Sequence, residues 1–143
     1  MSYAAQADLV DRFGAAELAQ LTDPTAGTTI NATTVARALS DADAEIDVRL
    51  ATRYALPLAA TPVVLVRVAA DLARYFLWDA RATEQVRNRY KDAIKLLDQI
   101  AGGAVKLGGV LELAPNATAV AVLASAPARQ FSTALLDQFG AAQ

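Results

Sequence analysis

Two prolines five residues apart separate two stretches of helical periodicity, and this corner limits the folds that the chain can adopt. In "RYALPLAATPVVLVRV", Pro57 and Pro62 bound a short uncharged linker. A proline has no amide hydrogen, and its ring disfavours helical geometry at the residue before it, so Pro57 should end the preceding helix. Pro62 suits the first turn of a new helix, and the hydroxyl of Thr61 can cap its free amides. The pattern predicts two long helices joined at a short apolar corner.

The residues on both sides of the corner repeat at helical spacing. From about residue 33 to 54 the apolar stripe consists of Val35, Leu39, Ala42, Ile46, Leu50 and Tyr54. The opposite face carries Asp41, Asp43 and Asp47, which we interpret as solvated, and Glu45 lies four residues before Arg49, an order that favours an ion pair. From about residue 62 to 81 the packing groups are Leu65, Val68, Ala69, Leu72 and Phe76, with Ala70 and Ala73 allowing close neighbours. We expect this second helix to be central.

The other segments complete a mainly α fold. "YAAQADLVDRFG" predicts a short helix that ends at Gly14, "TDPTAGTTINATT" has the composition of a surface loop, and a helix opens after Thr83 and runs to Gly102. Alternation in "VLELAPNATAVAVLA" predicts a short β-hairpin, and the apolar end "SAPARQFSTALLDQFG" predicts a docking tail. We therefore predict a compact bundle of four to five helices over residues 1–109. The hairpin and tail, residues 110–143, should pack on this core or on a neighbouring subunit.

Composition excludes several classes of function. The chain has 143 residues, the size of one domain, and it contains neither Cys nor His. Thiol nucleophiles, disulfides, imidazole acid–base chemistry and Cys- or His-based metal sites are therefore excluded. No phosphate-binding loop, nucleophile elbow or zinc spacing occurs, and the uncharged run 113–128 is short and broken by Pro115. We expect no enzyme activity, no cofactor, no metal and no membrane partner.

Basic residues form two groups that could face a partner. Arg67, Arg74 and Arg81 are seven residues apart, with Asp71 within reach of the first two. Arg87, Arg89, Lys91 and Lys95 make the helix after Thr83 locally basic. Both groups are also explained by solvated helix faces with ion pairs. The net charge of −2 gives no general attraction to nucleic acid, so any contact with DNA would be local.

The order of several segments resembles the Mu-like phage head-completion and head–tail connector proteins. These segments are "ADLVDRFG", "AEIDVRLATRYALPL", "TPVVLVRVAADLARYFLWDARATEQVRNRYKDAIKLLDQIAGGAVKLG" and "SAPARQFSTALLDQF". The resemblance covers nearly the whole chain. It implies a small, mainly helical structural adaptor of the virion neck, assembled in the host bacterial cytoplasm, that docks on the portal ring and extends the DNA channel toward the tail.

The resemblance also implies partners: the portal protein, a downstream neck or tail-completion protein, and identical neighbours in a homo-oligomeric ring, although the isolated chain could be a monomer. Packaged DNA would pass through the channel without sequence-specific contact. On this hypothesis the proline corner fixes the angle between the two long helices, so that each copy presents the same shape to its neighbours.

Candidate interface residues follow from their chemical character. They are Arg67, Arg74, Arg81, Arg87, Arg89, Lys91, Phe131, Leu135, Leu136 and Phe139. Two other classes stay open. A helical DNA-binding module would use the basic face of the helix after Thr83, with an affinity that falls steeply with salt. A small acid–base enzyme would need carboxylates that converge in a pocket.

Overall fold

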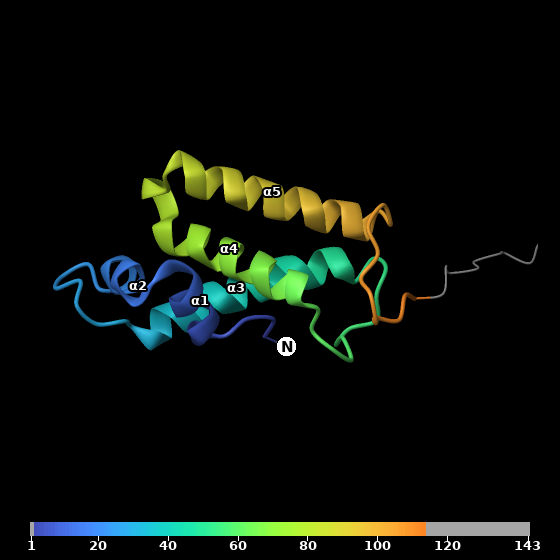
Figure 1. The fold of residues 1–143 in the computed structure, drawn as a ribbon, viewed down its shortest axis with the longest axis horizontal. Helices are drawn as coiled ribbons and strands as arrows, with labels where there is room; N and C mark the ends of the chain where they lie inside the picture. Colours follow the sequence, from blue (N-terminus) through green and yellow to red (C-terminus); the bar gives the residue numbers. More distant parts are fainter. Residues whose placement is uncertain (1, 114–143) are drawn as a thin grey trace, which may run out of the picture. The chain divides into compact units, whose positions relative to one another are not determined.

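A computed structural model describes residues 2–113 of the chain. In this part the chain forms five α-helices and one 3-10 turn (Figure 1), with the order α1 (Gln6–Phe13), α2 (Ala15–Thr22), α3 (Ala32–Leu50), α4 (Val63–Trp78), η1 (Asp79–Arg81) and α5 (Glu84–Ala101). The described residues form no strand, and their one β-bridge joins Tyr54 to Glu112. The mainly α prediction is confirmed for this part of the chain.

Helix α4 is the centre of the bundle. It packs against α1, α2, α3 and α5, and Figure 1 shows it running between α3 and α5. Leu65 and Leu72 are fully buried on it, and so are the small residues Ala69 and Ala73. Burial of each leucine side chain contributes about 1.5–3 kcal/mol, and the alanines let neighbouring helices approach closely. The expectation of a central helix is therefore confirmed.

The helix ends follow the sequence signals in part. Asn31 caps α3 by accepting from the amides of Thr33 at 3.1 Å and Thr34 at 3.2 Å, while Thr83 caps α5 through the amide of Val86 at 3.4 Å. The expected cap by the Thr61 hydroxyl was wrong: Pro62 occupies the N-cap position of α4, and no side chain caps that helix.

The long helix before the corner is shorter than its periodicity predicted. It ends at Leu50 rather than at Tyr54, and a turn follows in which the amide of Tyr54 donates to the carbonyl of Leu50 at 2.8 Å. Pro57 therefore lies beyond the helix end and does not itself stop the helix. Similarly, α4 ends at Trp78, where Asp79 takes a positive φ of 48°, and residues 79–81 form a 3-10 turn.

The corner holds the segment that follows α5. Tyr54 is buried there, and its hydroxyl accepts from the amide of Leu107 at 3.1 Å. The carbonyl of Arg53 accepts from the amide of Leu113 at 2.8 Å, and the Arg53 guanidinium pairs with Glu112 at 3.0 Å. These contacts join chain segments more than fifty residues apart, so the corner and residues 107–113 form one unit.

The N-terminal segment is fixed on the acidic face of α3. The amide of Tyr3 donates to Asp43 at 3.0 Å, and the Tyr3 hydroxyl donates to Asp47. Burial of the ring, together with the hydrogen bond to Asp47, raises the pKa of Tyr3 above its usual value. Our interpretation of Asp43 and Asp47 as solvated was therefore wrong, because a residue forty positions away binds them. Asp41 is exposed, as expected.

The loop between α2 and α3 is organised by one carboxylate. Asp23 accepts from the amides of Ala26 at 3.1 Å and Thr25 at 3.2 Å and from the hydroxyl of Thr29 at 3.3 Å. These bonds, the one from Ala26 foremost, lower the pKa of Asp23. Local bonding of this kind is typical of Asp in turns, and it agrees with the predicted surface loop.

The predicted β-hairpin and docking tail lie outside the described residues, apart from the hairpin's first residues, 110–113. Of these, Glu112 forms the isolated bridge to Tyr54 and Leu113 donates to Arg53, so this stretch pairs with the corner. The candidate interface residues Phe131, Leu135, Leu136 and Phe139 also lie outside the described part. The hairpin, the tail and the division at residue 109 stay predictions.

Candidate functional site

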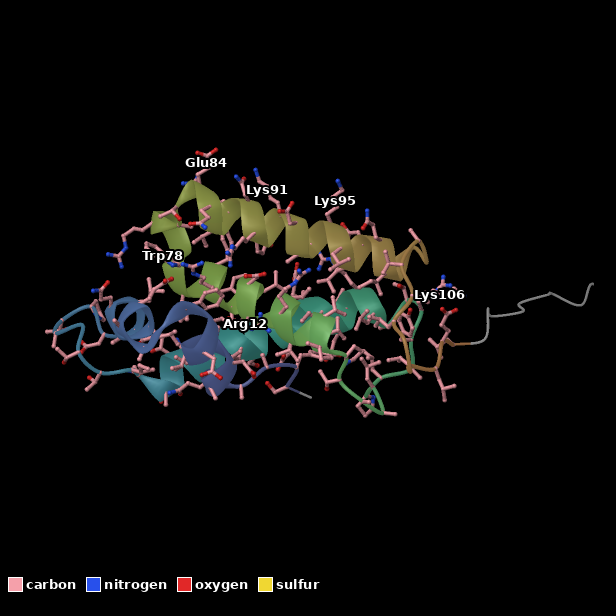
Figure 2. The ribbon with its side chains drawn as sticks, viewed as in Figure 1. Arg12, Trp78, Glu84, Lys91, Lys95 and Lys106 are labelled. Atoms are coloured by element: carbon pink, nitrogen blue, oxygen red, sulfur yellow. The ribbon has the colours of Figure 1, made fainter. Side chains whose placement is uncertain are left out.

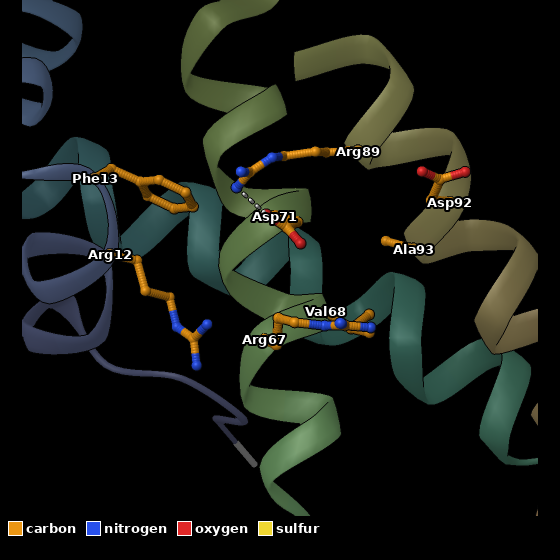
Figure 3. Close-up of a pocket in the computed structure, with 8 residues that line it drawn as sticks. All are labelled: Arg12, Phe13, Arg67, Val68, Asp71, Arg89, Asp92 and Ala93. Carbon is orange, nitrogen blue, oxygen red and sulfur yellow. Dashed lines mark ion pairs between the residues drawn. The ribbon is translucent and has the colours of Figure 1, made fainter. Parts of the chain in front are cut away.

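A pocket of about 390 Å³ opens where α1, α4 and α5 meet (Figure 3). Its lining combines guanidinium groups, carboxylates and a small apolar surface: Arg12, Phe13, Arg67, Val68, Asp71, Arg89, Asp92 and Ala93. Figure 3 shows Arg12 extending from α1, Arg67 from α4, and Arg89 reaching from α5 toward Asp71. Three cationic side chains from three helices therefore line one concave site.

Helix geometry explains why these residues meet. Arg67 and Asp71 are four residues apart on α4 and share one face, and Arg89 and Asp92 are three apart on α5. Arg12 lies in the last turn of α1, where a basic side chain is also favoured by the helix dipole. Because α4 packs against both α1 and α5, its exposed edge becomes the floor of the pocket.

The electrostatics of the pocket centre on Asp71. Its side chain is 16% exposed, and its nearest cation, Nη1 of Arg89, lies 3.7 Å away. Burial raises the pKa of Asp71, and the surrounding arginines, Arg89 first and then Arg67 and Arg12, act against that rise. The carboxylate thus lies among several cations without a close hydrogen bond to any of them.

A second arginine on α4 has a different environment. Nε and Nη2 of Arg74 donate to the two carboxylate oxygens of Glu17 at 2.7 and 2.9 Å, and Trp78 Nε1 donates to Glu17 at 3.1 Å. The Arg74 guanidinium also lies over the ring of Phe13, 4.4 Å from its centre. This cluster joins α1 and α2 to α4, and it holds Phe13 in the wall of the pocket.

The other predicted basic residues separate into different environments. Arg87 donates through Nε and Nη2 to the carbonyl of Ala82 at 3.0 and 2.7 Å, so it closes the turn before α5. Arg81 is exposed in η1. Lys91 lies on the outer side of α5, and Figure 2 shows it pointing away from α4, as does Lys95.

Of the candidates chosen from sequence, Arg67 and Arg89 line the same pocket. The structure adds Arg12, which sequence reasoning did not select. No local pattern could have identified Arg12, because its proximity to the other two arginines depends on the packing of α1 against α4. Residues 2–113 contain no cluster of three or more acidic side chains arranged to hold a metal ion. Over the same range, no helix has the length and apolar character needed to cross a membrane.

Comparison with known proteins identifies the family. Residues 3–124 match the family described as "Bacteriophage Mu, Gp36", which covers most of the chain. The chain belongs to the Bacteriophage Mu Gp36 family. The matched region includes every described helix and the whole arginine pocket. The resemblance predicted a Mu-like phage protein, and this prediction is therefore confirmed.

Two known proteins are similar in sequence to this chain over about three quarters of their own length. The "Mu-like prophage FluMu protein gp36" of Haemophilus influenzae is 40% identical over 106 residues, which cover 74% of this chain and 75% of the relative. The "Gene product J" of Escherichia phage Mu is 36% identical over 104 residues, covering 72% of this chain and 74% of the relative. Similarity therefore extends to both a phage and a prophage protein.

Proposed function

We propose that this Gp36-family protein is a structural subunit of the phage neck, a head-completion or head–tail connector protein. In this role it docks on the portal ring, forms a homo-oligomeric ring and extends the DNA channel toward a downstream neck or tail-completion protein. Its place is the virion neck after assembly in the bacterial cytoplasm. Family membership over residues 3–124 is the observation that carries the proposal.

The helical core supports a role based on shape. The corner between α3 and α4 is tied to residues 107–113 by the Tyr54–Leu107 and Arg53–Glu112 contacts, and Glu17 ties α2 to Arg74 on α4. A subunit with such long-range ties keeps the relative positions of its helices. Closed rings need the same surfaces at the same angles in every copy, which a stiff core provides.

The chemistry of the described core also favours a structural role over catalysis. The chain lacks His and Cys, and the two carboxylates of the pocket, Asp71 and Asp92, are accompanied by three arginines rather than by a nucleophile. A DNA-binding module based on α5 is less well supported, because Arg87 is bound to Ala82 and Arg89 faces Asp71. Lys91 and Lys95 then remain as the outward basic pair of that helix.

The proposal is tested by particle completion. A prophage with a stop codon early in this gene should form DNA-packaged heads that leak their genome and do not join tails, and the wild-type chain supplied in trans should restore infectious particles. Co-sedimentation of the purified chain with portal-bearing, DNA-filled heads measures docking directly. Normal tailed particles formed without the protein would refute the neck role.

A further inference from the structure

We propose that the pocket of Arg12, Arg67 and Arg89 receives an acidic side chain, aspartate or glutamate, from a protein partner. This inference deepens the proposed neck function by naming the chemistry of one contact surface, and only the identity of the partner rests on that function. The pocket lies within the described helical core, so its ligand can be tested on the isolated chain.

The first observation is the unused donor capacity of the three arginines. Within residues 2–113, the guanidinium groups of Arg12, Arg67 and Arg89 donate no hydrogen bond, in contrast to those of Arg49, Arg53, Arg74 and Arg87. The approach of Arg89 to Asp71, at 3.7 Å, is longer than a charge-assisted hydrogen bond. Each guanidinium can therefore offer a planar pair of donors to an incoming carboxylate.

The second observation is an excess of positive charge at a concave site. Three guanidinium groups face two carboxylates, Asp71 and Asp92, and one added carboxylate balances the pocket. Phe13 and Val68 supply apolar surface on which the methylenes of a glutamate side chain can pack. A volume of about 390 Å³ accommodates one side chain with part of its backbone.

The same features disfavour a nucleic-acid backbone as the ligand. A phosphodiester chain needs a track of cations along its length, whereas Asp71 and Asp92 interrupt this site. The chain as a whole carries a net charge of −2, which gives no long-range attraction to DNA. A protein partner can place one carboxylate in the pocket alone, whereas a nucleic-acid backbone would also bring neighbouring phosphates close to Asp71 and Asp92.

The walls of the pocket are fixed before any ligand arrives. Arg74 stacks on Phe13 and is held by both oxygens of Glu17, so α1 and its Arg12 are attached to α4. Tyr75 of α4 stacks on Tyr90 of α5, with ring centres 4.1 Å apart, beside Arg89 in sequence. These contacts fix the helices that carry the pocket, so binding has to order only the arginine side chains.

The test uses the full-length chain and a fluorescent oligoglutamate peptide, with an oligoglutamine peptide of equal length as the neutral probe. Fluorescence anisotropy at low salt should show binding of oligoglutamate alone. The double variant R12Q/R89Q should weaken this binding about tenfold or more, because it removes two charge-assisted contacts. The matched control R37Q/K95Q removes the same charge from exposed positions outside the pocket and should bind like wild type.

A third variant gives a change in the opposite direction. Asp71→Asn removes the carboxylate that competes for the arginines, so oligoglutamate should bind more tightly than to wild type. Circular dichroism confirms that each variant is folded. Equal losses in R12Q/R89Q and R37Q/K95Q would overturn the proposal, because the attraction would then be general. Tighter binding of duplex DNA than of oligoglutamate, with the same dependence on Arg12 and Arg89, would also overturn it.

The outcome is separable from that of the neck role. Loss of peptide binding in R12Q/R89Q is measured without portal, heads or tails, whereas the neck role is judged by completion of particles. A protein that completes particles but binds no oligoglutamate would retain the neck function and lose this pocket assignment. If the protein binds oligoglutamate through the pocket but is dispensable for tailed particles, the pocket assignment is retained and the neck function is refuted.

Discussion

Tyr54 connects the corner to the segment after α5 through one buried hydrogen bond. Replacing it with phenylalanine keeps the ring but leaves the amide of Leu107 without its acceptor. A buried donor left unpaired costs about 1–3 kcal/mol, so Tyr54→Phe should lower the free energy of unfolding by that amount. Urea denaturation followed by circular dichroism measures the change.

The control is Tyr90→Phe, which keeps the ring stacked on Tyr75 and removes a hydroxyl that makes no hydrogen bond within residues 2–113. This variant should unfold close to wild type. If both substitutions had the same small effect, the Tyr54 hydroxyl would not be holding the segment that contains Leu107.

Asp71 should make stability depend on pH. Because burial raises its pKa in the folded chain, its favourable contribution is complete below the unfolded pKa, near 3.8, and is lost as pH rises through the folded value. Asp71→Asn removes this loss. The variant should therefore gain melting temperature relative to wild type at neutral pH, and the gain should shrink as the pH approaches 3.8 or lower.

Thermal melts of wild type and Asp71→Asn over this pH range test the sign. Asp92→Asn changes the charge of the same pocket equally at an exposed position and serves as the control. A gain that is largest in acid would mean that Arg89, Arg67 and Arg12 stabilise the ionised carboxylate more than burial opposes it.

Local residue pairs were predictable, and distant ones were not. The Glu45–Arg49 pair was expected from its i, i+4 spacing and is present at 2.7 Å, with Asp98 of α5 adding a second partner to Arg49 at 3.1 Å. The pairing of Glu17 with Arg74 spans 57 residues and depends on where α2 docks. Periodicity carries no information on such a contact, so the closest ties of the core and the position of Arg12 had to come from the structure.

At the scale of elements, the apolar periods predicted the three long helices correctly, but tertiary contacts moved their ends. Tyr54 continues the helical stripe of α3 in sequence, yet its backbone bridges Glu112 and its hydroxyl binds the Leu107 amide. These tertiary contacts are favoured over one more turn of helix, so α3 ends at Leu50. Capping by Asn31, in contrast, is local and could have been predicted from the sequence rules for helix starts.

The turn after α5 gives an element-scale prediction. Gly103 has a φ of +81°, and a Cβ built there would collide with Nη1 of Arg53. Gly103→Ala must therefore both strain the backbone and displace the guanidinium that pairs with Glu112. Gly109→Ala is the matched control, because its φ is +75° and its added Cβ meets no atom within 4 Å.

Both glycine variants share the cost of a positive φ, about 1–2 kcal/mol. Gly103→Ala should be more destabilising than Gly109→Ala by the cost of moving Arg53. Urea denaturation of the two variants measures this difference. Equal effects would show that the Arg53 side chain moves aside freely and does not fix residues 102–113 to the corner.

At the scale of the whole described core, α4 is the element on which the others depend, since α1, α2, α3 and α5 all pack against it. The sequence predicted its central place through its alanines and its uninterrupted apolar face. The arrangement of α1 and α2 around it was not predictable, because short helices with weak periods can dock in several ways. A change at α4 should therefore affect every described helix that packs on it.

Overpacking α4 tests this dependence. Ala73 is fully buried, so Ala73→Leu should destabilise the core by about 1–3 kcal/mol. The single tryptophan, Trp78, reports on the α2–α4 contact through its bond to Glu17, and far-UV circular dichroism reports on all the helices. If the packing of all helices depends on α4, the unfolding midpoints of both signals should shift together to lower urea concentration.

Val63→Leu enlarges a residue on the same helix that is 78% exposed, and it should leave both transitions unchanged. Separation of the two transitions in Ala73→Leu would mean that α2 folds independently of the long helices, and that the described core does not unfold as one unit.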